Sequence, residues 1–482
     1  MKKITLQVVI IVCLSIVCLG LLTACASQTG ITQTKKINVT ATDAQIKTIN
    51  MQGQWKGEDQ RETYITETLK EFEARNPDIK INLKWNGDFP NGRAGCLQSS
   101  IDQFKSGNIS WDVIWLEPQN YLTIADALNN QDWAKEYLVD FESVPGFNET
   151  QKSFILSDPQ FSNHMNGVIT GPYIEGFYQP FFYNKKLTDM IGIQVKDKDM
   201  TFDDLLGYFK AVDDYNKAHG TNYSILYDAG DKTGTGPGRA QSSWNIFQSL
   251  FRSEFSDLNE LKNTAPSAKK MAAVRKVLGS LEELSKYHPM MQGWEDFQWF
   301  STRSYVLDDK AVFTAAGASW MYSHWHGLDP VKTMKMVPVE MPVYQPVNHY
   351  IGGYNPMFAV AKNSPVKDEA ISLMMQFSTP NNAEKWIRYA KAPSGIHGSI
   401  SEAGNTNSNI TQFDTFITYI TDKYGSNVFD SKSVDYVLGD KYKDLTVKFD
   451  THLGDVMSGK ITADEAYAQI LADMKEVDDK QK

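Results

Sequence analysis

Short apolar segments alternate with amphipathic ones over residues 46–116, and this order restricts the fold more than any other feature of the sequence. In the first amphipathic segment, Ile65, Leu69 and Phe72 recur at helical spacing and would share one face. The expected strands and helices cover, in order, residues 46–51, 62–75, 79–85, 95–106 and 111–116. Alternation of strand and helix is typical of a parallel sheet with helices on its faces. The sequence therefore predicts an α/β fold.

Polar and aromatic residues lie at the carboxyl ends of these predicted strands. Gln54 and Trp55 come after the first strand. Trp85 ends the second strand, and Glu117 follows the third. Ligands of open α/β sheets bind beyond the carboxyl ends of the strands. We therefore expect these loops to gather at one edge of the sheet and to form part of a binding site.

The stretch 167–184 is rich in aromatic residues and differs from a core strand. Pro172 has no N–H to donate to a sheet, and Glu175 is the only acidic residue of the stretch. A chain of 482 residues is also too long for one hydrophobic core. We interpret the stretch as a crossing between two lobes, with Tyr173, Glu175 and Tyr178 at the mouth of a cleft. A half-buried edge strand is the alternative interpretation.

Two later segments, residues 310–325 and 351–362, are expected to cross between the lobes as well. Each combines a short apolar strand with small residues that allow a turn. Capping boxes that begin at Thr201 and Thr462 predict the starts of two further helices.

The first residues have the pattern of an exported lipoprotein. Lys2 and Lys3 precede an apolar run over residues 8–22, and small residues follow it. The sequence LTAC matches a bacterial lipobox, which predicts cleavage of a signal peptide before Cys25 and attachment of lipid to the Cys25 sulfur. Residues 25–46 would form the lipidated cysteine and a flexible tether. A plain signal peptide or an uncleaved anchor is the alternative.

Charge and cysteine content argue against several classes of protein. Removal of residues 1–24 takes away two lysines and no acidic residue, so 46 basic residues face 58 acidic ones and the net charge is −12. Nucleic acid is therefore not expected as a partner. If Cys25 is lipidated, only Cys96 remains, so no intramolecular disulfide is expected and we interpret Cys96 as a buried small hydrophobic residue.

The chain contains 11 tryptophans, and many of them fall in predicted loops. A pyranose ring has an apolar face and a rim of hydroxyls, so aromatic rings beside carboxylates and amides suit it. The candidate platforms are Trp55, Trp85, Trp115, Tyr173, Trp320, Trp325 and Tyr354, and the candidate hydrogen-bonding residues are Gln54, Glu117, Asn120 and Glu175. Core packing is the alternative for each ring, and we expect it for Trp111, Trp133, Trp299 and Trp386.

Other functions would use some of the same residues. Glu117 and Glu175 could be the paired carboxylates of a secreted glycoside hydrolase. His324 and His326 could begin a metal-capturing site, which usually needs three or four converging ligands. The glycine-rich residues 228–239 lack the spacing of a phosphate-binding loop, and we expect a surface loop there.

Several motifs, taken in their order along the chain, resemble those of a known family. They are LTAC, EFEARNPDIKINL, WDVIWLE, GPYIEGFYQPFFYNKKL, TFDDLLGYFKAV, DDKAVFTAAGASW, IGGYNPMFAVAKNSPVKDEAISLMMQF and GKITADEAYAQIL. The resemblance is to the family 1 extracellular solute-binding lipoproteins, the maltose-binding-protein-like receptors of carbohydrate ABC importers. It covers most of the chain after the tether.

The resemblance implies a type II periplasmic-binding-protein fold with two α/β lobes and three hinge crossings. Each lobe would have a mostly parallel sheet flanked by helices. One lobe would contain residues 47–172 and 316–352, and the other would contain residues 173–315 and 353–482. The lobes would close on a sugar or oligosaccharide, and the permease of an ABC importer would recognise the closed form.

The resemblance also implies positions for ligand contacts. By the family motifs these are residues 117–120, Tyr173, Glu175 and Trp320; Trp55 and Trp85 correspond by loop position only, and Trp244 corresponds weakly. Binding followed by closure is expected, without covalent chemistry, so neither a cofactor nor a catalytic residue is expected. A monomer held to the outer face of the cell membrane by lipid is expected.

Overall fold

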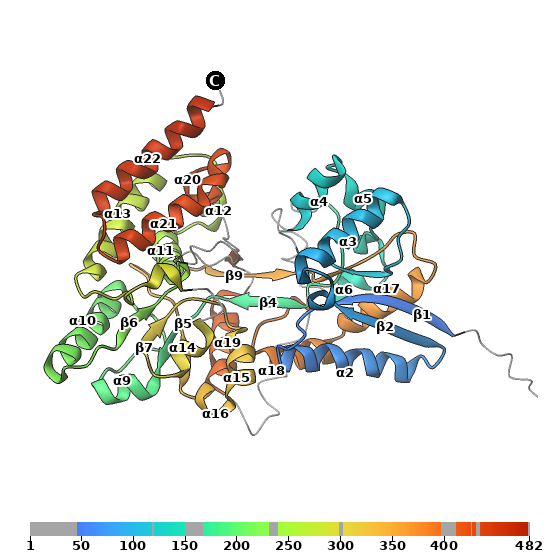
Figure 1. Cartoon of the computed structure of the whole chain (residues 1–482), viewed down its shortest axis with the longest axis horizontal. Coiled ribbons are helices and arrows are strands. Elements are labelled where there is room, and N and C mark those ends of the chain that lie inside the picture. The colour runs from blue at the N-terminus through green and yellow to red at the C-terminus, as the bar shows by residue number, and fades with distance from the viewer. Residues whose placement is uncertain are drawn as a thin grey trace, which may run out of the picture. The chain divides into compact units, whose positions relative to one another are not determined.

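The computed structural model describes residues 46–117, 120–150, 167–230, 240–297, 302–396, 411–425, 427–429 and 434–480 (Figure 1). The predicted signal peptide, Cys25 and the tether up to residue 45 lie outside these ranges, as do Trp299 and most of the glycine-rich segment. Three sheets are present in the described part of the chain. Among the helices described, none combines the length and apolar character needed to cross a bilayer.

The first sheet has the strand order β10-β3-β1-β2. Its strands and connecting helices are β1 (Lys47–Gly53), α2 (Gln60–Arg75), β2 (Ile79–Trp85), α3 (Gly92–Ser106), β3 (Val113–Trp115) and β10 (Phe358–Val360). β1 runs parallel to β2, with Lys47 opposite Ile79 and Gly53 opposite Trp85, and it also runs parallel to β3. β10 is antiparallel to β3. The predicted alternation of strand and helix is confirmed in this part of the chain.

The second sheet has the strand order β6-β7-β5-β8. Its strands are β5 (Phe181–Asn184), β6 (Ser224–Tyr227), β7 (Ala311–Thr314) and β8 (Met336–Val339), and nearby helices include α10 (Phe202–His219), α11 (Gln241–Arg252) and α13 (Ala268–Ser285). β6 is parallel to β7, whereas β5 is antiparallel to both β7 and β8. The prediction of a mostly parallel sheet is therefore confirmed for the first sheet and wrong for the second.

The strands β4 (Glu175–Tyr178) and β9 (Tyr350–Asn355) run side by side and antiparallel to each other (Figure 1). β11 (Val428–Phe429) pairs with the other edge of β9. Residues 391–396 also lie against the start of β4, where the Gly395 N–H donates to the Tyr173 carbonyl at 2.9 Å. The aromatic stretch 167–184 thus contains a strand that belongs to neither four-stranded sheet, in agreement with its interpretation as a crossing.

Each of these two paired strands continues past a proline into a four-stranded sheet. β4 leads through Gln179 and Pro180 to β5, and β9 leads through Pro356 and Met357 to β10. Proline interrupts a strand ladder because it has no N–H to donate. β5 and β10 directly follow β4 and β9 along the chain, so they run away from the β4–β9 pair. Their partners β3 and β7 run toward the pair. This difference in direction explains the antiparallel partners of β5 and β10.

The observed pairings correct the expected grouping of three segments. β8 lies within residues 316–352, which were expected beside the first sheet, but it pairs with β5 of the second sheet. β10 lies within residues 353–482, which were expected in the other lobe, but it pairs with β3. Residues 310–325 were expected to be a crossing, but they contain β7 of the second sheet. The sequence analysis predicted an apolar strand within residues 310–325 and within residues 351–362 but not their partners, and it predicted no strand at β8.

Local signals were more reliable than pairings. Thr201 forms a capping box with Asp204, and Thr462 accepts from the Glu465 N–H while Glu465 accepts in return. Cys96 is fully buried in α3, as expected, and burial raises the pKa of its thiol to about 12. The remaining helices are η1 (Asn86–Asp88), α4 (Asn120–Leu128), α5 (Trp133–Tyr137), η2 (Phe141–Ser143), α6 (Phe147–Thr150), α9 (Lys185–Ile191), α12 (Leu258–Lys262), η3 (Trp294–Asp296), α14 (Thr302–Leu307), α15 (Met321–Leu328), α16 (Pro330–Thr333), α17 (Lys367–Phe377), α18 (Pro380–Ala390), α19 (Gln412–Tyr424), α20 (Asp435–Leu438), η5 (Asp440–Leu445), α21 (Thr446–Met457) and α22 (Ala463–Lys480).

Candidate ligand-binding site

The loop after β1 places Trp55 beside the first sheet. Trp55 has a φ of 76°, a left-handed conformation that is unfavourable for a bulky residue. Its ring centroid lies 5.0 Å from that of Trp386 and 6.5 Å from that of Phe358. Only 2% of Trp55 is exposed. Packing against these two rings therefore holds a backbone conformation that the loop alone would not favour.

Arg61, in the first turn of α2, lies at the centre of the candidate site. Its guanidinium carbon is 5.5 Å from the ring centroid of Trp55 and 5.2 Å from that of Trp320. The guanidinium also pairs with Glu58 and lies 3.7 Å from Glu175 Oε1. The Arg61 side chain is 5% exposed. Two predicted tryptophans and one predicted carboxylate thus converge on a residue that was not predicted.

The beginning of α2 lies against α15 through polar contacts. Arg61 Nη2 is 3.0 Å from His324 Nε2. The other contacts join Ser323 Oγ to the Glu58 carbonyl at 2.8 Å and His326 Nδ1 to Asp59 Oδ2 at 2.8 Å. α2 packs on β2 of the first sheet, whereas α15 packs on α14, which contacts β7 of the second. These contacts therefore join elements that belong to different sheets.

Amide and carboxylate groups meet at the carboxyl edge of the first sheet. Gln54 Nε2 donates to Glu117 Oε1 at 3.1 Å, and Asn86 Nδ2 donates to Gln54 Oε1. Gln54 and Asn86 are buried, and Glu117 is half-buried. The three residues follow β1, β2 and β3, so the ends of neighbouring strands meet as the general rule for open sheets predicts. The structure brings Gln54 and Glu117 together as expected.

Three buried N–H donors near this edge have no acceptor in the described part of the protein. They are Arg61 Nε, Trp115 Nε1 and Asn120 Nδ2. A buried donor without an acceptor costs roughly 1–3 kcal/mol. A ligand rich in oxygen atoms would supply acceptors to donors of this kind.

Three other predicted aromatic residues lie in hydrophobic cores. Trp244 is buried within α11, where its ring packs on neighbours from α11 and α21. Trp325 is fully buried and packs edge to face on Phe182 at 4.8 Å. Tyr354 is fully buried, its hydroxyl lies 3.1 Å from that of Tyr178, and burial raises the pKa of both phenols. Packing with other protein groups accounts for the position of each of these rings.

Trp85 and Tyr173 are buried but lie close to the strand ends. The Trp85 ring covers Gly53, where an added Cβ would meet it at 2.9 Å. Tyr173 is 3% exposed and contacts residues 391–396 through its carbonyl. Among the tryptophans expected in the core, Trp133 and Trp386 are fully buried and Trp111 is half-buried.

Sequence reasoning missed Arg61 and Glu58 and considered His324 only as a metal ligand. Charged residues in the first turn of an amphipathic helix usually face solvent, so nothing in the spacing marked Arg61 as buried. The available signal was position, because Glu58 and Arg61 directly follow the Trp55 loop. Within the described ranges, no group of three or more His, Cys, Asp or Glu residues is placed to hold a metal ion.

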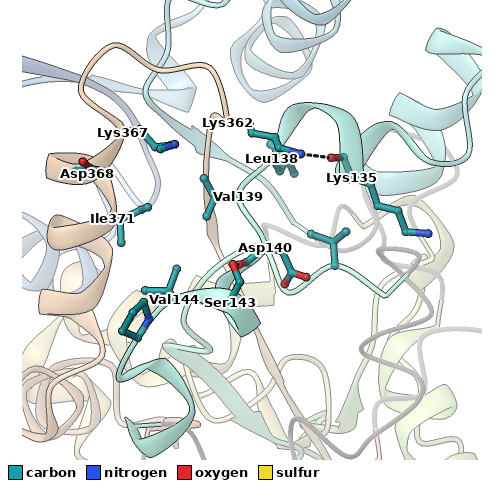
Figure 2. Close-up of a pocket in the computed structure, with 12 residues that line it drawn as sticks. Lys135, Leu138, Val139, Asp140, Ser143, Val144, Lys362, Lys367, Asp368 and Ile371 are labelled. Carbon is teal, nitrogen blue, oxygen red and sulfur yellow. Dashed lines mark hydrogen bonds between the residues drawn. The ribbon is translucent and has the colours of Figure 1, made fainter.

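A cavity of about 610 Å³ lies near η2 and the start of α17 (Figure 2). Three lysines, two aspartates and several aliphatic side chains line it, but no aromatic ring and none of the predicted site residues does so. Lys362 Nζ donates to the Lys135 carbonyl at 3.0 Å. Because it lacks an aromatic platform, this cavity does not suit a pyranose ring.

No protein-family model matches the sequence, and a search of well-characterised proteins finds no relative. Solved structures match the fold. The GacH receptor of Streptomyces glaucescens is 14% identical with a TM-score of 0.61, over 89% of this chain and 98% of that one. The binding protein MsmE of Bacillus subtilis is 14% identical with a TM-score of 0.60, over 91% and 99%. A chitin oligosaccharide binding protein is 14% identical with a TM-score of 0.62, over 90% and 98%.

These similarities extend over almost the whole length of the matched chains, and at this identity they concern the fold. The chain has the two-lobed α/β fold of solute-binding proteins. The fold class expected from the sequence motifs is therefore confirmed.

Proposed function

We propose that this chain is an extracytoplasmic solute-binding lipoprotein that captures a sugar or oligosaccharide and delivers it to the permease of an ABC importer. The main support is the convergence of Trp55, Trp320 and Glu175 on Arg61 in a solute-binding fold. The GacH receptor has been solved with acarbose, and another structural neighbour is named for chitin oligosaccharides.

The chemistry of the site suits a carbohydrate. Indole rings can face the apolar side of a sugar, and the carboxylates of Glu117 and Glu175 can accept hydrogen bonds from its hydroxyls. The side-chain donors of Trp115 and Asn120, which have no acceptor among the described residues, can donate to sugar oxygens. A sugar presents donors and acceptors around one ring, so it can use both kinds of group at once.

We propose that the ligand acts by favouring a closed form. The two lobes would centre on the first and second sheets, with β4, β9 and residues 391–396 near the junction between them. Arg61 belongs to a helix on the first sheet, and Trp320 precedes a helix next to the second. A ligand that contacts both sides can shift the population toward closure, whereas a ligand that contacts one side cannot.

The proposal includes a monomer held to the outer face of the membrane by lipid on Cys25, with no nucleic acid partner. The lipobox supports the lipid anchor, and the acidic net charge argues against a nucleic acid partner. We propose binding without covalent chemistry. Glycoside hydrolysis by Glu117 and Glu175 is not favoured, because the structural neighbours are binding proteins.

A thermal-shift screen tests the proposed function. The chain without residues 1–25 is heated with maltotriose, raffinose, xylotriose or chitotriose, each at millimolar concentration. A sugar that binds only the folded state raises the melting temperature according to its concentration and Kd. Absence of any shift with all four sugars, confirmed by calorimetric titration, would contradict the proposal. Release of reducing sugar during incubation would favour the hydrolase instead.

A further inference from the structure

The guanidinium of Arg61 lies within 5.5 Å of two indole centroids, and its Nε–H has no acceptor in the described structure. We infer that Arg61 is a specificity-determining residue of the proposed sugar site. It donates the Nε–H to a ligand oxygen and holds the rings of Trp55 and Trp320 in position. This inference rests on the proposed function, because it names a further residue of the same site.

The partners of Arg61 fix the orientation of its guanidinium. Arginine only donates hydrogen bonds, so His324 Nε2 accepts from Arg61 Nη2 across 3.0 Å. His324 Nε2 also lies 3.4 Å from Glu58 Oε2, so Glu58, Arg61 and His324 form one cluster. Glu58 pairs with Nη2 as well, and Glu175 lies nearest to Nη1. Both terminal nitrogens thus face protein groups, and the Nε–H is left for another acceptor.

A second buried arginine shows what a purely structural role looks like in this chain. Arg252 is fully buried, and its Nε–H donates to Ser249 Oγ at 3.4 Å. Its Nη1 donates to the His349 carbonyl, and its guanidinium carbon lies 5.0 Å from the Tyr350 ring. All of these partners belong to the surrounding core, and Arg252 Nη2, like Arg61 Nε, has no acceptor among the described residues. The neighbours of the two arginines therefore distinguish their roles. Arg61, in contrast, lies beside Trp55, Trp320 and Glu175, which were selected from the sequence as ligand contacts.

The Arg61→Lys variant distinguishes a role of the guanidinium geometry from a role of positive charge alone. Lysine keeps the positive charge but lacks the planar fork, so it cannot pair with Glu58 and His324 while also offering a fixed donor. We expect the Arg61→Lys change to weaken binding of the preferred sugar at least tenfold. It should also change the ratio of Kd values between the two tightest sugars at least fivefold. A structural role alone would weaken all sugars by the same factor.

The experiment titrates maltotriose, raffinose, xylotriose and chitotriose by calorimetry into the wild type, Arg61→Lys and Arg93→Gln. Arg93 is a matched control, because it reaches the same Glu58 at 3.4 Å but is 52% exposed. We expect Arg93→Gln to bind within twofold of the wild type. If the wild type binds a sugar and Arg61→Lys keeps the same ratio of Kd values between sugars, the inference about Arg61 is overturned and the proposed function is not. A wild type that binds none of the four overturns the proposed function as well.

A second pair of variants keeps the test valid if Arg61→Lys does not fold. His324→Leu removes the acceptor of Arg61 Nη2, whereas His324→Gln keeps an oxygen acceptor there. We expect His324→Leu to change the preference among the four sugars and His324→Gln to retain it within twofold. Equal preferences in both variants would contradict a role for the orientation of Arg61.

Discussion

Across the β4–β9 pair, the ring of Tyr178 covers Gly352 and the ring of Tyr354 covers Gly176. Tyr178 stands opposite Gly352 and Tyr354 stands opposite Gly176, and the two phenol oxygens are 3.1 Å apart. An added Cβ at Gly352 would lie 2.7 Å from the Tyr178 ring, and one at Gly176 would lie 2.7 Å from the Tyr354 ring. The two strands are thus joined by side chains as well as by backbone hydrogen bonds.

We expect Gly176→Ala to destabilise the protein by about 1–3 kcal/mol, the usual cost of overpacking. The new methyl group would meet the Pro393 carbonyl as well as the Tyr354 ring. Urea unfolding of the variant measures the change. Gly207→Ala is the matched control, because nothing lies within 4 Å of its added Cβ in α10 and alanine favours a helix by about 0.5–1 kcal/mol. Equal stability of wild type and Gly176→Ala would mean that residues 391–396 do not pack on β4.

The sequence predicted helices and strands better than it predicted which strands pair with each other. Helical and strand periodicity and capping boxes depend on neighbouring residues, so α2, β2 and α10 were found close to their observed bounds. The partners of β8 and β10 depend on the direction in which the chain leaves the β4–β9 pair. No local pattern contains that information. The grouping of segments into lobes was therefore the weakest part of the fold prediction.

In the candidate site, too, residues that depend on local position were predicted, and a residue that depends on a distant element was missed. Gln54 and Glu117 were predicted because strand ends in an open sheet share one edge, and the structure joins them by a hydrogen bond. Trp325 and Tyr354 are aromatic residues near glycine or small residues, and this pattern does not distinguish a binding platform from a core residue. Arg61 was missed because its burial depends on α15, which is more than 250 residues away in the sequence.

We expect Trp320→Ala to weaken sugar binding at least tenfold and to abolish the change in intrinsic fluorescence that a bound sugar causes. Trp320 is half-buried and lies beside Arg61, so its removal takes away one of the two indole rings of the site. Fluorescence titration with the sugar found by thermal shift measures the effect. Trp244→Phe is the control, because Trp244 is buried in α11. Unchanged affinity in Trp320→Ala would remove Trp320 from the site.

Cys96 should be unreactive until the protein unfolds. It is fully buried, and burial raises the pKa of its thiol to about 12, so almost no thiolate is present at pH 8. With residues 1–25 removed, Cys96 is the only cysteine in the chain. We expect a chromogenic disulfide reagent to label it at least a hundredfold faster in 8 M urea than in buffer. Rapid labelling of the native protein would show that the α3 region opens readily.

His349 should make the stability of the protein depend on pH. It is fully buried, and burial, assisted by the charge of Arg252, lowers its pKa from 6.5 to about 4. The unfolded chain therefore takes up a proton before the folded one does. The contribution of neutral His349 to the free energy of unfolding is complete above pH 6.5 and decreases as the pH falls from 6.5 to about 4. The shift corresponds to a total loss of about 3 kcal/mol.

Urea unfolding at pH 7.5, 5.5 and 4.5 tests this dependence. We expect His349→Gln to lose less stability than the wild type between pH 7.5 and 4.5, because glutamine takes up no proton. His219→Gln should follow the wild type, since His219 is exposed at the end of α10. Parallel pH profiles for the wild type and His349→Gln would show that His349 is accessible to protons in the folded state. A difference that appears only below pH 6.5 would identify the buried imidazole as its cause.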